Sequence, residues 1–395
     1  MDIFFVNTKN FTRYILLKWR VLPLIDRWIL KELTPPLFFA IAAFTVVSLS
    51  VGVMFDLVRK IVEYGLPFQI ALKVLLLKIP GFLVISFPMA MLMATLLAYS
   101  RLSANSELKA LRSLGITTGR MILPAMALAL CMTFLTFIFN DIIVPKSNRS
   151  ADITLKSALG KSISTEKGND IIYSRFGRIN NPDLSLSKKR LIQLFYSRKF
   201  RNGFMEDVTV LDFSRIGYTQ FLIAKKALWN AKESKWEFVE GKVLTLAPNG
   251  STTTINFERY LYPLGEAPRK IGQLPKDAND MTILEAVKAK NLYEQAGNIK
   301  ESRRMSVRIQ EKFTLPMACM VFSLIGSSLG AKPNTKTSRS QGFGLSVVLI
   351  LFYYILSFFF SSLGVKGTIS PFLSAWSPVF ISTFFGTLLL KQSSR

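Results

Sequence analysis

The run Leu-Gly-Lys-Ser at residues 159–162 is the part of this sequence that comes nearest to a loop that binds nucleotide phosphates. Such a loop has the pattern G-x-x-x-x-G-K-[S/T], which requires a glycine at position 155, and this chain has Leu155 there. The chain contains no histidine, and Cys131 and Cys319 both lie in apolar runs. We therefore expect no ATP site, no metal site and no catalytic residue, which predicts a protein that is not an enzyme.

Binding of phosphates or acidic sugars is the chemistry that the basic residues support. Arg59 and Lys60 follow the first long apolar run, and three arginines precede the fourth, at Arg303, Arg304 and Arg308. A guanidinium can hold a phosphate through two parallel hydrogen bonds, so these five residues are candidates for binding such an anionic group. The alternative for each is a side chain that extends to the head groups of ordinary lipids.

Six long apolar runs must position these side chains. Half of the residues are hydrophobic and the mean hydropathy is positive, which is typical of a protein that crosses a membrane several times. Each run has the length of about 20 residues that a spanning helix needs, and none carries a charge in its central part. The predicted spans are 34–55, 79–99, 121–141, 313–331, 343–364 and 372–390.

The distribution of basic residues predicts the orientation of the spans. The net charge is +25, and a large part of it flanks the spans on one side. The short loops on the other side carry only Arg59, Lys60 and Lys366, so the positive-inside rule places both termini in the cytoplasm. Anionic lipid head groups explain the flanking charges better than nucleic acid does. Residues 1–33 are apolar but contain many cations, which predicts an interfacial helix.

A polar insert at residues 145–308 separates the third span from the fourth, and three crossings place it on the outer side of the membrane. Alternating apolar positions at 220–229, 235–246 and 253–262 predict strands of a sandwich or rolled sheet, and 280–297 has a helical period. The positions expected to face its interior are Phe221, Ile223, Trp236, Phe238, Val243, Ile255 and Phe257. Phe221 and Phe238 are our candidates for lipid contact.

A charged, helix-forming segment at residues 103–115 joins the second and third spans. Ser103 or Asn105 can cap its start, and Gly115 can end it. One helical stripe would hold Ala104, Leu108, Leu111 and Gly115, and the remaining surface would hold Glu107, Lys109 and Arg112. Two interpretations stay open, namely a solvated turn on the membrane and a short rigid helix that lodges in a groove of a cytoplasmic ATPase.

Several stretches of the chain resemble the LptF/LptG (YjgP/YjgQ) family of permeases. IDRWILKELTPP at 25–36 is similar to the opening of the family's first span, and SANSELKALRSLGIT at 103–117 is similar to the segment after its second span. Residues 224–243 carry the family's pattern of Ala, Trp, Trp and a Gly after an acidic residue. Residues 280–298 and 308–331 match its approach to the fourth span. The resemblance covers nearly the whole chain in the right order.

The resemblance implies an α-helical membrane protein of six transmembrane helices, three before and three after an inserted periplasmic β-jellyroll-like domain. The domains would be an interfacial helix (1–33), three spans with a coupling helix at 103–115 (34–144), the periplasmic domain with a helical linker (145–308) and three further spans (309–395). The implied function is the permease subunit of an ATP-driven exporter in the bacterial inner membrane. It would extract lipopolysaccharide or a related glycolipid and pass it to periplasmic bridge proteins for delivery to the outer membrane.

Partners follow from the same resemblance. ATP and Mg would be bound by a separate LptB-like ABC ATPase in the cytoplasm, and an LptC/LptA-like bridge would receive the lipid in the periplasm. A second LptF/LptG-type permease, or a second copy of this chain, would complete an apolar path between the first and fifth spans. The residues expected to couple to the ATPase are Glu107, Leu108, Leu111, Arg112 and Gly115.

Two other functions compete with this interpretation. An ion-coupled secondary transporter would need carboxylates or broken helices within the membrane, and Pro80, Gly81 and Pro88 can break the second span. A membrane scaffold whose β domain only binds proteins would make no contact with an ATPase at 103–115. Co-purification with an ATPase separates all three functions.

Overall fold

The computed structural model describes residues 23–158, 169–177, 190–201, 204–214, 217–230, 233, 235–264, 280–295, 297–332 and 339–393. Two compact units divide the chain, and we describe each by itself. The first comprises Met1–Asp152, Gln310–Leu363 and Phe372–Arg395, and the second comprises Ile153–Ile309 and Gly364–Pro371. We call them the helical unit and the β unit.

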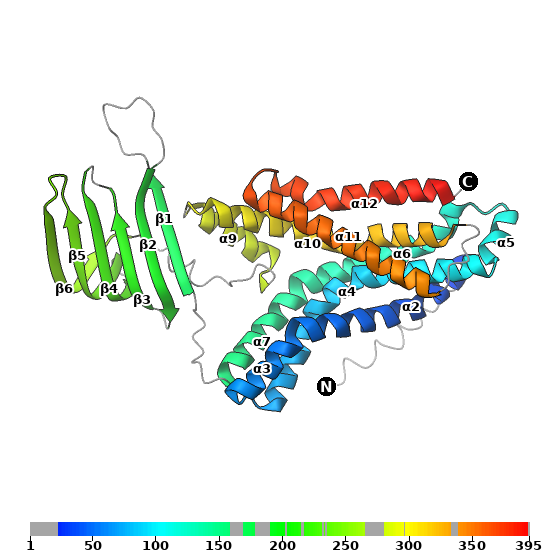
Figure 1. The fold of residues 1–395 in the computed structure, drawn as a ribbon, viewed down its shortest axis with the longest axis horizontal. Helices are drawn as coiled ribbons and strands as arrows, with labels where there is room; N and C mark the ends of the chain where they lie inside the picture. The colour runs from blue at the N-terminus through cyan, green and yellow to red at the C-terminus, as the bar shows by residue number, and fades with distance from the viewer. Residues whose placement is uncertain are drawn as a thin grey trace, which may run out of the picture. The chain divides into compact units, whose positions relative to one another are not determined.

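Six helices among the described residues are long and apolar enough to cross a membrane, which confirms the predicted three-plus-three arrangement (Figure 1). The helices before the sheet are α2 (Leu24–Leu49), η1 (Ser50–Met54), α3 (Phe55–Tyr64), α4 (Phe68–Ala104), α5 (Glu107–Ser113), α6 (Thr118–Ile138), η2 (Phe139–Ile143) and α7 (Val144–Ala158). Those after it are α9 (Ile283–Gln295), α10 (Ile299–Gly330), α11 (Arg339–Lys366) and α12 (Pro371–Ser393). Because α2 begins at Leu24, residues 24–33 of the predicted interfacial helix belong to the first spanning helix, and residues 1–22 lie outside the described residues.

Hydroxyl groups inside the spans bond to their own helix. The Ser86 hydroxyl donates to the Phe82 carbonyl at 2.9 Å, and the Thr136 hydroxyl donates to the Met132 carbonyl at 2.6 Å. Hydrocarbon offers no hydrogen-bonding partner, so a polar side chain that bonds four residues back can lie in the membrane at little cost.

The helices α4 and α10 approach each other backbone to backbone. A Cβ atom added at Gly326 would lie 2.8 Å from the Leu92 carbonyl oxygen and would overlap the Thr95 side chain. A Cβ atom added at Gly330, one turn further along, would lie 2.7 Å from the Tyr99 Cβ and 2.9 Å from the Leu96 carbonyl oxygen. Small residues four apart are the usual means by which membrane helices pack closely, and here they allow no larger side chain.

The β unit contains one six-stranded antiparallel sheet whose strands lie in chain order. The strands are β1 (Asn169–Gly177), β2 (Arg190–Arg201), β3 (Phe204–Asp212), β4 (Thr219–Asn230), β5 (Lys235–Leu246) and β6 (Thr252–Tyr262). The three strands predicted from apolar alternation correspond to β4, β5 and β6.

A bend crosses the sheet from β2 to β6. In each of these strands one residue is skipped by the ladder of paired residues, and together they form one row: Arg198, Asp207, Lys225, Glu240 and Glu258. The buried positions change parity at this row, as from Ala224 to Ala227 in β4. Asp207 and Glu240 in the row have positive φ angles of 49° and 52°. Because every strand turns at the same row, the sheet folds as a whole.

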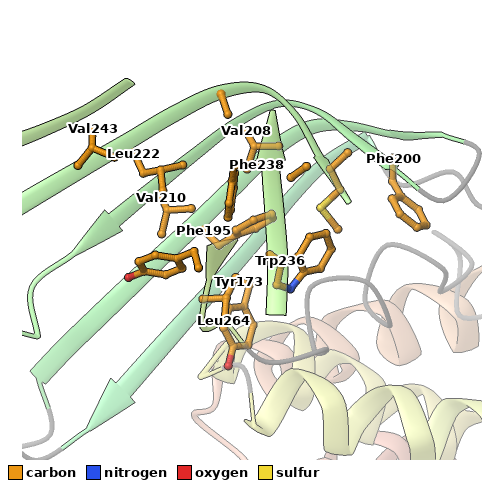
Figure 2. Close-up of a cluster of buried hydrophobic side chains, with 14 residues drawn as sticks. Tyr173, Phe195, Phe200, Val208, Val210, Leu222, Trp236, Phe238, Val243 and Leu264 are labelled. Atoms are coloured by element: carbon orange, nitrogen blue, oxygen red, sulfur yellow. The ribbon is translucent and has the colours of Figure 1, made fainter. Parts of the chain in front are cut away.

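The two halves of the folded sheet face each other across an apolar interior (Figure 2). The ring of Phe195 in β2 lies 5.8 Å from that of Trp236 in β5, although two strands separate β2 and β5 in the sheet. Tyr262 at the end of β6 bonds to Gln193 in β2. These contacts confirm the prediction of a rolled sheet.

The prediction that Phe221 and Ile223 face this interior is wrong. Leu222 and Ala224 are the buried residues of β4, and 42% of the Ile223 side chain is exposed. Apolar residues occupy four successive positions at 221–224, so alternation alone does not reveal which face is buried. Phe221 lies instead beside Leu211 and Leu244 on the outer face.

We expect Gly326→Val to destabilise the helical unit, because the added methyl groups must push α10 away from α4. The expected loss is about 3 kcal/mol, the upper end of the range for overpacking. The measurement is the thermal unfolding midpoint of the purified chain in detergent. Gly344→Val is the matched control, since a Cβ at this spanning-helix glycine meets nothing within 4 Å. Equal midpoints for the two variants would contradict the prediction.

Candidate functional site

A short helix lies in the loop between the second and third spans, but it is shorter than the predicted segment at 103–115. It runs from Glu107 to Ser113, while α4 continues through Ala104. Neither predicted cap holds the position before the helix, which Ser106 occupies with φ at 60°. Ser103 donates instead to the Lys332 carbonyl at 2.8 Å, and the Asn105 side chain donates to the Glu107 carboxylate at 2.9 Å.

The inner side of α5 is fixed to the spans. Leu108 is buried among side chains of α2, α4 and α6, and Leu111 packs against the same cluster. Arg112 donates from Nη2 to the Ala331 carbonyl oxygen at 2.8 Å, just beyond the last turn of α10. The carbonyl end of a helix attracts cations, so this bond ties α5 to α10. Leu108 and Arg112 therefore hold the helix in place.

The outer side of α5 ends in an exposed apolar side chain that the sequence did not single out. Leu114 is 77% exposed and comes directly before Gly115, whose φ of 82° ends the helix. Lys109 is exposed and Glu107 is half-buried on the surface of the same helix. The sequence contained one sign of this side chain, a leucine outside the stripe of Leu108 and Leu111. The predicted helix extended to Gly115 and therefore included Leu114, whereas α5 ends at Ser113.

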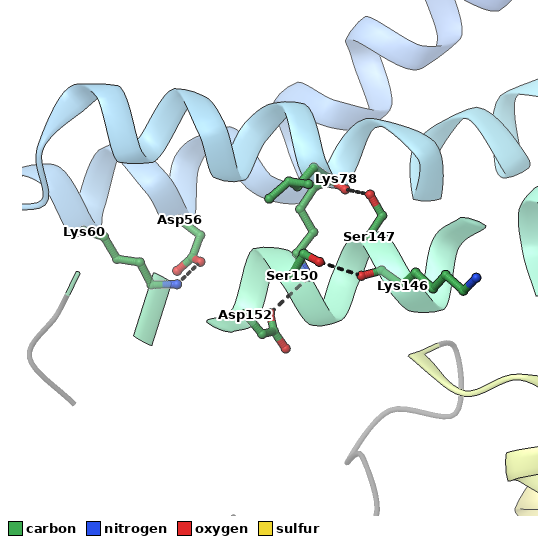
Figure 3. A network of polar contacts seen from close by, with 8 residues as sticks. Asp56, Lys60, Lys78, Lys146, Ser147, Ser150 and Asp152 are labelled. Carbon is green, nitrogen blue, oxygen red and sulfur yellow. Dashed lines mark hydrogen bonds and ion pairs between the residues drawn. The ribbon is translucent and has the colours of Figure 1, made fainter. Parts of the chain in front are cut away.

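The cations after the first span are paired within their own helix, and Figure 3 shows the pair of Lys60 with Asp56. Arg59, 71% exposed, donates to Glu63 at 2.9 Å, and Lys60 lies 2.5 Å from Asp56. The four charges of α3 therefore balance, so a phosphate must compete with the carboxylates for Arg59 and Lys60. Exposed ion pairs of this kind are weak, which leaves such an exchange open.

A second polar contact joins the outer ends of α4 and α7 (Figure 3). Lys78 lies 3.3 Å from the Asp152 carboxylate, and the Ser147 hydroxyl donates to the Leu77 carbonyl at 2.7 Å. These bonds hold together two helix ends that extend past the apolar runs.

The three arginines before the fourth span lie on the first turns of α10 and also have partners in the chain. Arg303 donates to the Lys366 carbonyl at 3.2 Å, and Arg304 lies 3.6 Å from Glu301. Arg308 is half-buried one turn further on. Arg303 is the most exposed of the three, so its position suits contact with a ligand best.

One end of the β unit's interior, around Phe238, is filled, whereas an apolar residue of β6 is exposed. Phe238, predicted to face inward, is fully buried beside Tyr262, with the ring centroids 6.2 Å apart. Ile255 pairs with the buried Val243 and shares its face, yet it is 58% exposed. The apolar interior therefore extends to the surface along β6.

A buried polar network lies at the filled end. The Gln193 amide donates to the Asp212 carboxylate and to the Tyr262 hydroxyl, each at 2.9 Å, and that hydroxyl also donates to Asp212. Burial would raise the pKa of Asp212, but hydrogen bonds from Ser214, Tyr262 and Gln193 outweigh it and hold the pKa below its ordinary value. The carboxylate therefore joins β2, β3 and β6 in its charged form.

Comparison with known proteins shows the family of this chain. The family model described as lipopolysaccharide export system permease LptF/LptG matches residues 27–392. The chain belongs to the LptF/LptG family. It is a permease of lipopolysaccharide export, a transport subunit rather than a catalyst, and a multi-pass protein of the inner membrane. A search of curated proteins finds no match.

This LptF/LptG permease also contains a buried lysine that the sequence did not reveal as part of a span. Lys312 in α10 is 7% exposed, and its Nζ donates to the Asn140 carbonyl at 3.0 Å and lies 3.9 Å from Asp141. Asn140 and Asp141 belong to η2, a π-helical turn whose widened backbone offers that carbonyl. The predicted span began at position 313, so Lys312 fell just outside it. The contact joins the third span to the fourth.

Asp212 should make the stability of the permease's β unit depend on pH. A carboxylate whose pKa is lowered by folding stabilises the fold above its unfolded pKa, ordinarily 3.8, and this stabilisation is lost as pH falls through the lower, folded pKa. We expect Asp212→Asn to unfold more easily at neutral pH and to lose less stability than the parent chain below about pH 4. Fluorine NMR of fluorotryptophan at Trp236 reports unfolding of this unit within the full chain. The control is Asp207→Asn, an exposed carboxylate in the same sheet, and identical acid profiles for the two variants would overturn the prediction.

Proposed function

We propose that this permease is the membrane subunit of an ATP-driven exporter that extracts lipopolysaccharide or a related glycolipid and passes it to periplasmic bridge proteins. Both termini would then face the cytoplasm and the β unit would face the periplasm. The observation that supports coupling best is α5, a helix fixed to the C-terminal end of α10 by Arg112 with Leu114 exposed at its end.

The physics of lipid extraction supports an external energy source. Moving acyl chains out of hydrocarbon costs about 0.8 kcal/mol per CH₂ group, which amounts to tens of kcal/mol for a lipid with several chains. The sequence has Leu155 where a phosphate-binding loop needs glycine, so we assign ATP and Mg to an LptB-like ABC ATPase. A rigid helix is needed to transmit its motion, because a flexible loop would absorb the displacement.

The surface of α5 suits a groove in such an ATPase. Leu114 would enter an apolar pocket, and Glu107, near the positive end of the helix, would pair with a basic residue beside it. Leu108, Leu111 and Arg112 would act indirectly, since they hold α5 against the spans. Gly115 would serve by ending the helix so that Leu114 projects.

A second permease subunit, either another LptF/LptG-type chain or a second copy, would cover part of the exposed apolar surface of the spans. Large side chains project from α2 and α11, among them Phe38, Phe39, Phe352 and Phe358. Such faces are suited to lipid chains or to a partner helix, so we assign the lipid path to the region between these two spans of a dimer.

The β unit would shelter the acyl chains after extraction. Its interior is apolar, and Ile255 marks a side from which chains can enter without crossing the outer face. An LptC/LptA-like bridge would continue this apolar path in the periplasm. Arg59, Lys60, Arg303, Arg304 and Arg308 would meet the phosphates of the lipid, with Arg303 the most accessible.

The first test concerns the ATPase. We expect Glu107→Arg to reduce co-purification of the ATPase with the permease by about tenfold or more, because the reversed charge would face a basic groove. Gly119→Arg is the control, since position 119 follows α5 and a Cβ there meets nothing within 4 Å. Undiminished recovery of the ATPase with Glu107→Arg, in membranes where the variant inserts normally, would refute the assignment of α5.

The second test concerns hand-off of the lipid. We expect a photo-reactive amino acid at position 255 to crosslink to lipopolysaccharide only when ATP is supplied, and the same probe at position 256 to crosslink little. Ile255 and Asn256 are both exposed neighbours on β6 but belong to opposite faces of the sheet. Equal crosslinking at the two positions, or crosslinking that ignores ATP, would remove the transport role of the β unit.

A further inference from the structure

We propose that α9 anchors the permease to the membrane surface, with Leu284 and Val287 inserted among the lipids and Lys288 placed against the phosphates of anionic phospholipids. This inference does not rest on the export function, because a surface anchor requires neither an ATPase nor lipopolysaccharide.

One face of α9 packs on α10, and Leu292 and Tyr293 near its end pack against the core of the sheet. The remaining face has no cover among the described residues of the β unit. Ala286 and Ala289 are buried in a small cluster with Met281 and Met305, and Ile309 packs against it. The exposed stripe holds Leu284, Val287, Lys288 and Asn291, spaced as one helical face. Leu284 and Val287, one turn apart on this stripe, are 75% and 38% exposed, so they form a small apolar patch.

The chain direction places the apolar end of this stripe towards the membrane. A tight turn at Gly297, with Asn298 donating to the Tyr293 carbonyl at 2.9 Å, connects α9 to α10 and makes the two helices antiparallel neighbours. The start of α9 therefore lies beside the later turns of α10, where Ile309 joins the shared cluster. The apolar run of α10 begins at Phe313, about 6 Å further along the helix axis.

A second contact supports the same position of these α10 turns relative to the spans. Arg303 donates to the Lys366 carbonyl, and its guanidinium lies against Gly367, so this turn of α10 meets the end of the fifth span. Residues 304–309 are then closer to the hydrocarbon than the point where that span ends. Leu284, beside them, falls at the level of the lipid head groups.

The order of side chains along the stripe fits a membrane surface. Leu284 is nearest to the bilayer, Val287 and Lys288 follow one turn above it, and Asn291 lies one turn higher. Interfacial helices have this arrangement, in which apolar residues enter the head-group region and cations meet the phosphates. Lys300 and Arg303 are also exposed on the adjoining helix α10, so the charges complement an anionic surface.

The test measures the depth of a spin label at position 284 in the full chain, reconstituted in nanodiscs that contain phosphatidylglycerol. Cys131→Ala and Cys319→Ala remove the native thiols, which are both free. We expect the label at 284 to collide severalfold more with oxygen, relative to a water-soluble nickel complex, than a label at 291. Lys288→Glu should lower this ratio in phosphatidylglycerol but leave it unchanged in phosphatidylcholine alone.

Two outcomes would overturn the anchor. A label at 284 that is as accessible to nickel as the label at 291 would place α9 in water. Exclusion of both reagents at 284 would mean that protein, from the β unit or a second chain, covers Leu284. Neither outcome depends on ATP or lipopolysaccharide, so the anchor and the export function fail separately.

Discussion

The contact between α4 and α10 at Gly326 and Gly330 is the constraint on which the helical unit depends. Lipid tails are as apolar as leucine, so spans gain little from burying apolar side chains and must gain from close packing. Two glycines bring α10 against α4 until backbone touches backbone. The end of α10 at Ala331 and Lys332 is thereby fixed, and Arg112 and Ser103 bond to those two carbonyls. The position of α5 thus follows from glycine packing within the spans.

The same helix would carry any displacement of α5 to the opposite end of the spans. A helix of 32 residues is about 48 Å long and stiff along its axis, so α10 cannot be displaced at Ala331 without moving throughout. Lys312 ties its middle to the third span at η2, where a π-helical turn supplies the acceptor carbonyl. Motion of α10 therefore requires either that η2 deforms or that the buried lysine exchanges its partners. A buried charge without partners is costly, which favours deformation of the turn.

The sequence predicts the features that depend on the length of apolar runs and on alternation of apolar and polar residues. It fails where two local patterns compete. Six spans follow from apolar length, and β4, β5 and β6 follow from alternation. Phe221 was misplaced because residues 221–224 are all apolar and the parity of buried positions changes at the bend. Leu114 was missed because the predicted helix extended to Gly115, whereas α5 ends at Ser113 and leaves Leu114 exposed just after it. The burial of Lys312 was not predicted, because lysine is usually exposed and its acceptor, the Asn140 carbonyl, is distant in the chain.

The interior of the β unit is packed unevenly. A sheet that only stabilises itself would fill its interior at the density of other protein cores, leaving no room for a lipid chain. Here the filled end, where Phe195 meets Trp236 and Asp212 joins three strands, supplies the stability. Ile255 on β6 shares the face of the buried Val243 but is exposed, so the sheet is packed less tightly there. The difference follows from the bend, because it brings β2 into contact with β5 at the filled end and leaves Ile255 on β6 without that cover among the described residues.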